Sequence, residues 1–254
     1  MYRLKGVQVL SAVFVCTAIA LPDLSQWAAA KSGPTSEPLQ LAQRRRLSFR
    51  VGVRPSRFRV GGFSRAATCG DRDTMIALVP PPQAQEAANR RTGEEPVDKT
   101  ASDRPTFFFY APYTSPKAAQ FTLQDEKGTQ QLYNIKFQLT GKPGIVGISL
   151  PKSGPALQVG QKYVWQVAVA CTPDDISNTV VISSWIERVA SSASQIGTLA
   201  EQGIWQDTVS LLALSRFQKP DDRQVAADWS SLMEDAGLAQ FKQTAIVQLV
   251  RNSN

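Results

Sequence analysis

The sequence predicts a mainly β domain, built as an antiparallel β-sandwich, followed by an α-helical tail. Between residues 66 and 190, short runs rich in β-branched and aromatic residues alternate with Pro and Gly, a pattern typical of strands and turns. No helical spacing of apolar residues interrupts these runs, and two packed sheets are the natural way to bury them. From residue 191 to residue 254 the apolar residues recur at helical spacing.

Residues 1–30 are typical of a cleaved secretory signal peptide. Basic residues near the start precede an apolar run over residues 7–21, and three alanines at positions 28–30 offer small residues for cleavage before Lys31. The apolar run is short for a membrane-spanning helix, which needs ~20 residues, and an uncleaved anchor is the alternative interpretation. We therefore expect a secreted or periplasmic mature chain with no transmembrane span.

The basic charge of the chain is concentrated in residues 31–65, which we expect to form a disordered tether. The formal net charge is +7, whereas acidic and basic residues nearly balance after position 65. The arginines of this segment are candidates for binding an anionic surface, and a solvated tether without a ligand is the alternative. Export argues against nucleic acid as the partner. The candidate arginines are Arg44, Arg45, Arg46, Arg50, Arg54, Arg57 and Arg59.

The strands of the sandwich are expected in a regular series after residue 66. Residues 80–103 interrupt the series and are expected to be a flexible insertion, because they are polar and rich in Pro and Glu. Residues 126–129 are expected to form a hairpin turn. The strands are expected over residues 74–79, 105–110, 118–124, 131–139, 144–150, 163–170 and 179–189.

Three consecutive phenylalanines lie in the second expected strand. Because successive side chains of a strand point to opposite faces, Phe108 must face away from Phe107 and Phe109. We therefore expect both faces of this strand to be covered, one by the opposing sheet and the other by the helical tail.

A local motif refines the type of sandwich. Leu157, Gly160 and Tyr163, with Trp165 and Val167 after them, resemble the start of the penultimate strand in immunoglobulin- and fibronectin-like sandwiches. In those folds the tyrosine hydroxyl forms a hydrogen bond with the preceding corner of the chain. An ordinary half-buried tyrosine is the alternative interpretation.

Cleavage of the signal would leave two cysteines, Cys69 and Cys171. An even number of cysteines in an exported chain predicts a disulfide, and two separately buried thiols are the alternative. Cys69 comes just before the first expected strand and Cys171 just after the sixth. If consecutive strands run up and down, both residues lie at the same end of the sandwich, so the pairing is geometrically reasonable.

The disulfide would bring four carboxylates to one rim of the sandwich. Clusters of carboxylate oxygens can hold Ca²⁺, so calcium is the alternative to our expectation that the chain has no cofactor. No calcium-binding loop supports the site, and two aspartates after Pro173 are also an ordinary turn sequence. The candidate ligands are Asp71, Asp73, Asp174 and Asp175.

The helical tail is expected over residues 191–254. Residues 199–220 resemble one tetratricopeptide-like helical hairpin with Gly203 at its turn. A further helix is expected from Asp222, a good N-cap residue, to Gly237, a typical stop. A single hairpin cannot bury both of its faces, so we expect the tail to pack on the sandwich or on a partner.

Motifs spread along the chain occur in a characteristic order. They are Gly61-Gly62, Arg65 and Cys69; Asp103-Arg104-Pro105-Thr106 with Phe107 to Tyr110; Gly144-Ile145-Val146 with Ser149-Leu150-Pro151; Val159-Gly160, Tyr163 and Trp165; Cys171-Thr172-Pro173-Asp174; Trp185-Ile186-Glu187-Arg188; and Gly203-Ile204-Trp205 with Asp207. As a set, over roughly residues 60–250, they resemble the exported cyanobacterial family catalogued as domain of unknown function 928. That family has no assigned catalytic residues, so the resemblance implies no mechanism.

The chain contains no histidine, and this narrows its chemistry. Ser-His-Asp sites, Cys-His sites and histidine metal sites are excluded. We therefore expect an exported, non-catalytic binding or adaptor module of the envelope or extracellular space. Its expected partner is another envelope protein or an anionic envelope polymer, bound by the tail or by the arginine-rich segment. The alternative is a hydrolase that uses a pair of carboxylates on envelope glycans.

Overall fold

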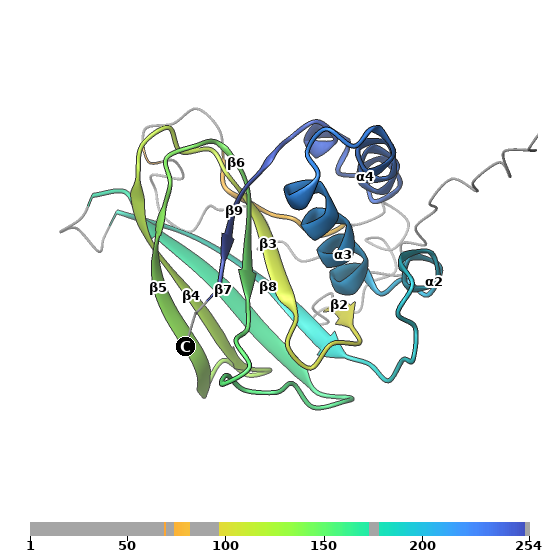
Figure 1. The fold of residues 1–254 in the computed structure, drawn as a ribbon. Helices are drawn as coiled ribbons and strands as arrows, with labels where there is room; N and C mark the ends of the chain where they lie inside the picture. Colours follow the sequence, from red (N-terminus) through yellow and green to blue (C-terminus); the bar gives the residue numbers. More distant parts are fainter. Residues whose placement is uncertain (1–68, 70–73, 82–96, 173–177, 252–254) are drawn as a thin grey trace, which may run out of the picture. The chain divides into compact units, whose positions relative to one another are not determined.

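A computed structural model describes residues 69, 74–81, 97–172 and 178–251 of the chain. Within these residues the fold is mainly β, with two sheets and a helical part near the C-terminal end (Figure 1). The predicted mainly β class with a helical tail is confirmed at this level. The expected signal peptide and the arginine-rich segment lie outside the described residues.

The first sheet has four strands. Their spatial order is β1 (Ile76–Ala77), β3 (Thr106–Ala111), β6 (Gly144–Ser149) and β9 (Ile246–Val250). β3 is antiparallel to both β1 and β6, whereas β9 runs parallel to β6. The last strand of the chain thus lies at an edge of this sheet, beside β6 (Figure 1).

The second sheet has five strands. Their spatial order is β2 (Val97–Thr100), β8 (Thr179–Arg188), β7 (Lys162–Ala170), β4 (Lys117–Asp125) and β5 (Gln131–Leu139). Neighbours are antiparallel except β2 and β8, which run parallel. The hairpin between β4 and β5 turns at Gly128, whose positive φ of 69° suits glycine.

Two strands correct the prediction of a purely antiparallel sandwich. β2 lies inside residues 80–103, which were expected to be a flexible insertion, and β9 lies inside the tail that was expected to be helical. Each pairs in parallel at one edge of a sheet. The sequence of β2 lacks an apolar stripe because Asp98 and Thr100 are its buried residues, which explains why its composition suggested a loop.

The core lies between the two sheets and is rich in aromatic side chains. The ring of Phe107 in β3 lies 5.0 Å from that of Phe121 in β4 and 5.4 Å from that of Trp165 in β7. Phe108, on the opposite face of β3, is 2% exposed, so both faces of this strand are covered as predicted. Gly147 in β6 makes room for the Phe108 ring.

The helical part consists of α2 (Ile196–Glu201), α3 (Trp205–Gln218), α4 (Arg223–Asp235) and a 3-10 turn, η2 (Ala239–Phe241). Gly203, at the turn between α2 and α3, has a φ of 68°, which glycine adopts without strain. Asp222 caps α4, because its side chain accepts hydrogen bonds from the backbone N–H groups of Gln224 and Val225. The predicted turn and cap are both confirmed.

α3 packs against the strands, as Figure 1 shows beside β3. The indole N–H of Trp205 donates a 2.9 Å hydrogen bond to the carbonyl oxygen of Leu78, next to β1. Trp229 of α4 donates to the carbonyl oxygen of Phe241, and the guanidinium of Arg216 lies 5.6 Å from the centre of the Trp229 ring. In the described part of the chain no helix is both long enough and apolar enough to cross a membrane.

The predicted disulfide is present. Cys69 and Cys171 are bonded, with their Cα atoms 4.7 Å apart. The carbonyl oxygen of Cys171 accepts a 3.1 Å hydrogen bond from the ammonium group of Lys117, which begins β4. The bridge therefore attaches the chain just before β1 to the end of β7.

Candidate functional site

A cavity of about 330 Å³ lies where the loop from β2 to β3 meets the first turns of α3. Its walls come from three stretches of chain that are far apart in the sequence. The lining residues are Ser102, Arg104, Pro105 and Thr106 of the loop and the start of β3, Ala193 and Ser194 before α2, and Leu199, Gln206, Asp207, Ser210 and Leu211 of the helices.

Asp207 fastens α3 to the loop. It lies in the first turn of the helix, where the helix dipole favours a negative charge. One carboxylate oxygen, Oδ2, accepts from the hydroxyl of Thr100 at 2.7 Å and from the N–H of Ala101 at 2.9 Å. The other, Oδ1, accepts from the N–H of Ser102 at 3.1 Å. Both carboxylate oxygens thus accept hydrogen bonds from the end of β2 and the loop that follows it.

Burial raises the pKa of the Asp207 carboxyl above its ordinary value, because the charged form loses hydration. The hydrogen bonds from Thr100, Ala101 and Ser102 lower that pKa and offset part of the effect. The group is therefore a desolvated carboxyl that is held in place by its donors.

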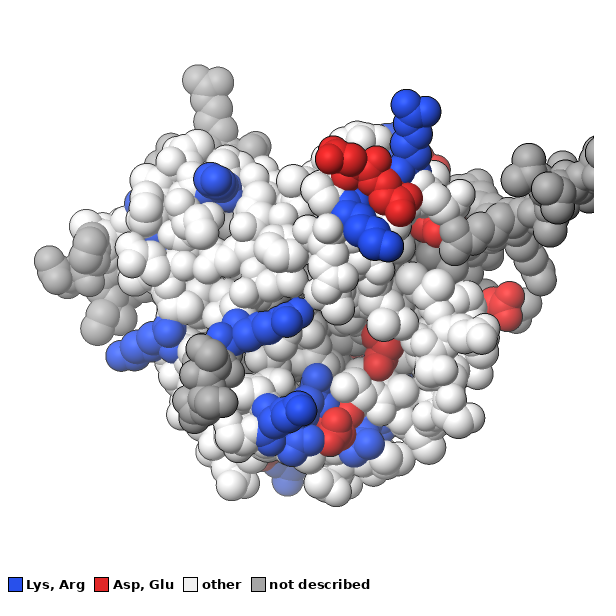
Figure 2. Space-filling view, in the orientation of Figure 1, with Lys and Arg blue, Asp and Glu red and all other residues white. Residues whose placement is uncertain are grey.

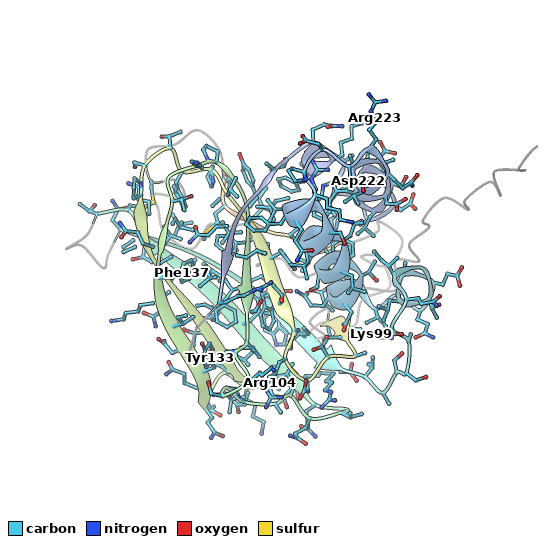
Figure 3. All side chains as sticks on the ribbon, viewed as in Figure 1. Lys99, Arg104, Tyr133, Phe137, Asp222 and Arg223 are labelled. Carbon is cyan, nitrogen blue, oxygen red and sulfur yellow. A yellow bond between two sulfur atoms is a disulfide. The ribbon has the colours of Figure 1, made fainter. Side chains whose placement is uncertain are left out.

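β2 places the loop that follows it beside Asp207. Alternation along the strand buries Asp98 and Thr100 and exposes Lys99 between them (Figure 3). The hydroxyl of Ser184 in β8 donates to the Asp98 carboxylate at 3.2 Å, and the carbonyl oxygen of Thr100 accepts from the N–H of Val189. β2 is thus fixed to β8 up to its last residue, where the hydroxyl of Thr100 reaches Asp207.

Gln206 lines the cavity and holds a buried acceptor. The residue is 1% exposed, and its side-chain Nε2 donates to the carbonyl oxygen of Thr106. Its Oε1 has no hydrogen-bond partner among the described residues. Buried side-chain oxygens in folded proteins are nearly always paired, so this unpaired atom needs an explanation.

Arg104 supplies a buried donor. Its Nη1 donates to the carboxylate of Asp103, with which it forms an ion pair. Its backbone N–H donates to the hydroxyl of Ser102 at 3.1 Å, which tightens the loop. Its Nε, however, is buried without a partner in the part of the chain that the structure describes. Figure 3 labels Arg104 on the loop that leads into β3.

The remaining wall of the cavity is neutral. The Ser210 hydroxyl lies 2.6 Å from the carbonyl oxygen of Gln206 and 3.4 Å from that of Thr106, so its proton is used within the protein. Pro105, Leu199 and Leu211 provide apolar surface, and Leu211 is 40% exposed. The cavity therefore has an apolar wall, and two of its lining residues, Arg104 and Gln206, each hold a buried polar atom that has no partner among the described residues.

A second, wider hollow of about 750 Å³ lies beside the first, around Arg188. The guanidinium of Arg188 donates to the carbonyl oxygens of Leu157 at 2.5 Å and Ala101 at 3.4 Å. These bonds fix the corner before β7 to the end of β2. The segment of residues 190–194 borders both hollows.

Residues 60–246 match the model of the family described as Domain of Unknown Function (DUF928). The chain belongs to this family. The resemblance that the motifs indicated is thereby confirmed. No curated protein matches the chain.

Two of the motifs that carry the DUF928 resemblance meet at the cavity. One begins at Asp103 and Arg104, and the other ends at Asp207. Neither motif has a role that the sequence alone reveals, because the hydrogen bonds that join their two regions link residues more than a hundred positions apart. The sequence feature that could have pointed to the site is the pair of opposite charges in Asp103-Arg104-Pro105, directly before a strongly apolar strand.

The other candidate sites of this DUF928 chain fall outside the described residues. The structure gives no information on the seven candidate arginines of residues 44–59 or on the candidate calcium ligands Asp71, Asp73, Asp174 and Asp175. In the described ranges, no three Asp, Glu, Cys or His residues form a group that could hold a metal ion.

The described charges of the domain are mixed in sign. On the face shown in Figure 2, acidic and basic side chains lie together over the helical part, and Lys and Arg side chains gather with an acidic one in the region of Arg104. Among the cavity's lining residues the charged ones are Arg104 and Asp207. The cavity wall therefore carries one basic and one acidic side chain, whose formal charges cancel.

Proposed function

We propose that the chain is an exported, non-catalytic binding or adaptor module of the envelope or extracellular space, and that it holds its ligand in the cavity beside α3. The observation that carries this proposal is a cavity whose lining residues include Arg104 and Gln206, each of which holds a buried side-chain atom without a partner among the described residues, Nε and Oε1. Leaving a buried donor or acceptor without a partner costs about 1–3 kcal/mol. A ligand that turns these two side chains toward the cavity and supplies both partners would recover that free energy.

The hydrogen bonds of Asp207 support binding without catalysis. Its two carboxylate oxygens receive hydrogen bonds from the loop, so neither faces a substrate as a free base. Glycoside hydrolysis needs a second carboxyl group roughly 5–9.5 Å from the first, on the other side of the scissile bond. Asp207 is the single carboxylate among the residues that line the cavity.

Export is supported by the disulfide, since such bonds persist mainly in oxidising compartments. The signal-like residues 1–30 point to the same compartment. We propose that the arginine-rich segment adds attraction to an anionic envelope polymer or to an acidic surface of an envelope protein, while the cavity recognises a specific group.

We also propose that the two sheets form an immunoglobulin- or fibronectin-like sandwich. The order β1-β3-β6 in one sheet and β8-β7-β4-β5 in the other supports this assignment. So does Tyr163 at the start of β7, whose hydroxyl oxygen accepts a 2.8 Å hydrogen bond from the N–H of Gln158 in the preceding corner. The turn at Gly203 supports a tetratricopeptide-like hairpin for α2 and α3.

The binding proposal is tested by co-sedimentation of the purified protein with isolated envelope material. The wild type should sediment with it, and Arg104→Lys, which keeps the charge for Asp103 but lacks the Nε–H group, should be retained about tenfold more weakly. Arg223→Lys, the same change at an exposed position in α4, should behave like the wild type. Equal loss in both variants, or no retention of the wild type, would contradict the proposal.

A carboxylate-dependent hydrolase is the second candidate. The raised pKa of Asp207 in a cavity is the observation that favours it, because a general acid must hold its proton near neutral pH. Incubation of envelope glycans with the wild type and with Asp207→Asn decides between the two. Soluble products that depend on Asp207 would favour the hydrolase over the binding module.

A further inference from the structure

We propose that residues 47–53 of the same chain add a strand to the outer edge of β5. The inference goes beyond the proposed function, because it needs neither the cavity nor its ligand. It rests on three observations: the outward backbone groups of β5, the half-buried apolar side chains along that strand, and a matching pattern in the sequence.

β5 is the longest edge strand that the structure describes. The two sheets end in β1 with two residues, β2 with four, β9 with five and β5 with nine. The last residue of β2 is already bonded to α3 through Asp207. Because an edge strand presents a row of backbone N–H and C=O groups to any strand beside it, β5 offers the most room for pairing.

Gln138 shows which backbone groups of β5 point outward. Its carbonyl oxygen accepts a 2.9 Å hydrogen bond from the side-chain Nε2 of Gln248 in β9. In an antiparallel pair every second residue bonds to the partner strand, so the backbone groups of Asn134 and Lys136 also point outward, whereas those of Ile135 point to β4. Within the described residues, no backbone–backbone bond reaches the outward groups of Asn134 and Lys136.

The core-facing side chains of β5 are only half-buried. Tyr133, Ile135 and Phe137 pack against the core, and the Tyr133 ring lies 6.4 Å from that of Phe121, yet all three remain partly exposed. Figure 3 labels Tyr133 and Phe137 on this strand. A strand added beside β5 would cover these side chains with its own apolar face.

Residues 46–54, which lie outside the described residues, have the alternation of a strand with one apolar face. Every second position is apolar, and the positions between are Arg, Ser or Gly. The apolar residues are Leu47, Phe49, Val51 and Val53. The second copy of the motif, Phe58-Arg59-Val60-Gly61, has two such positions before Gly62 interrupts the pattern. The first copy is therefore the segment that fits the edge, and for these residues a strand replaces the expected tether.

The chain is long enough to reach the edge. Cys69 is bonded to Cys171, directly after β7, and β4 separates β7 from β5. Two strand spacings are about 10 Å, and a strand as long as β5 measures about 30 Å. The stretch from Val53 to Cys69 can span up to about 53 Å, so it covers both distances.

An antiparallel pairing with Arg50 opposite Asn134 suits both faces of the added strand. Like charges directly opposite each other destabilise a sheet, and this register puts Ser48 rather than an arginine opposite Lys136. Aromatic side chains then meet aliphatic ones on the core side, which stabilises cross-strand pairs. These pairs are Leu47 with Phe137, Phe49 with Ile135, and Val51 with Tyr133.

The pairing gives the arginines of this segment a fixed arrangement. Arg46, Arg50 and Arg54 share the outer face of the added strand, with successive arginines about 13 Å apart. Three of the candidate arginines thus form a row instead of a mobile cluster. Its use in binding an anionic envelope polymer rests on the proposed function, whereas the pairing itself does not.

Amide hydrogen exchange of the purified full-length protein, followed residue by residue by NMR, tests the inference. The amides of Asn134 and Lys136 should exchange slowly in the wild type, because the added strand bonds them. Phe49→Ser should make both exchange at least about tenfold faster. Phe58→Ser, the same change in the second copy of the motif, should leave both slow. The amide of Ile135, which points to β4, should stay slow throughout and shows that the sheet is intact.

Three results would overturn the inference, and two of them need no variant. Fast exchange of Asn134 and Lys136 in the wild type would show that nothing covers the edge. Slow exchange that is lost on dilution would identify a second copy of the chain as the occupant. Slow exchange that survives Phe49→Ser would assign the edge to another segment. Retention on envelope material that depends on Arg104 is measured separately, so either proposal can fail while the other stands.

Discussion

The carboxylate of Asp207, in the first turn of α3, accepts a 2.7 Å hydrogen bond from the hydroxyl of Thr100, the last residue of β2. Through this bond the helical part holds the edge of the five-stranded sheet and the loop that follows it. Asp207 and Ser102, which this carboxylate also binds, line the cavity. The fold and the candidate site therefore depend on one carboxylate.

Replacing Asp207 with Asn should lower the free energy of unfolding by about 1–3 kcal/mol. The amide keeps one acceptor oxygen but turns an NH₂ group toward the backbone N–H of Ala101 or Ser102, so two donors face each other where a hydrogen bond stood. Urea unfolding measures the change. Asp221→Asn, at an exposed position before α4, is the matched control and should change stability little. A change in Asp207→Asn no larger than in the control would show that the loop does not need this carboxylate.

Burial of Asp207 should set the direction in which its contribution to stability changes with pH. Its folded pKa is raised above the ordinary value of 3.8, so between these two values the folded state binds more protons than the unfolded state. The stability that Asp207 contributes should therefore fall as pH rises through that window. Comparing the wild type with Asp207→Asn from roughly pH 4 to pH 7 isolates the effect.

This comparison also removes the opposite contribution of Asp125. The N–H of Gln130 and the hydroxyl and N–H of Thr129 lower the pKa of that carboxyl, so the stability it contributes is lost as pH falls. Since Asp125 is present in both proteins, its effect cancels in the difference. A difference that grows with rising pH would show that the donors around Asp207 outweigh its burial.

Removing the disulfide by Cys69→Ala and Cys171→Ala should lower the free energy of unfolding by about 2–5 kcal/mol. The strand pattern should survive, because the aromatic core between the sheets does not include the bridge. Thermal unfolding and circular dichroism measure the two effects. Labelling of two free thiols in the native, unreduced protein would contradict the bridge itself.

Gly147→Ala tests the packing of the four-stranded sheet. Gly147 in β6 lies opposite Phe108 of β3 and Leu249 of β9, and an added Cβ would come within 2.7 Å of both side chains. We expect a loss of about 1–3 kcal/mol from this crowding. Gly197→Ala in α2, where an added Cβ meets nothing within 4 Å, is the control and should be neutral or slightly stabilising. A neutral result for Gly147→Ala would contradict the placement of β9.

Much of the β structure could be predicted because its signals are local. The strand expected over residues 131–139 coincides with β5, since alternation and a flanking turn are visible in a short window. β9 was missed although Ile246 and Val247 favour strands, because it follows helices and its partner β6 lies about a hundred residues earlier. β2 was missed because its buried residues are polar.

The candidate site could not be predicted for a related reason. Asp207 resembles an ordinary charged residue in the first turn of a helix, and Arg104 resembles a charged residue before a strand. Their importance comes from the packing of α3 on β2, which buries polar atoms that a short segment would leave in water. The unpaired oxygen of Gln206 becomes apparent only when its neighbours are in place.

The Nε–H resonance of Arg104 tests the central claim most directly. In isotope-labelled protein it should shift, and its exchange with water should slow, when soluble envelope fragments are added, because a ligand completes the hydrogen bond that this atom lacks. The Nε–H resonance of the exposed Arg223 should not change. Binding of the fragments with the Arg104 resonance unchanged would contradict the claim, since the ligand would then occupy a different surface.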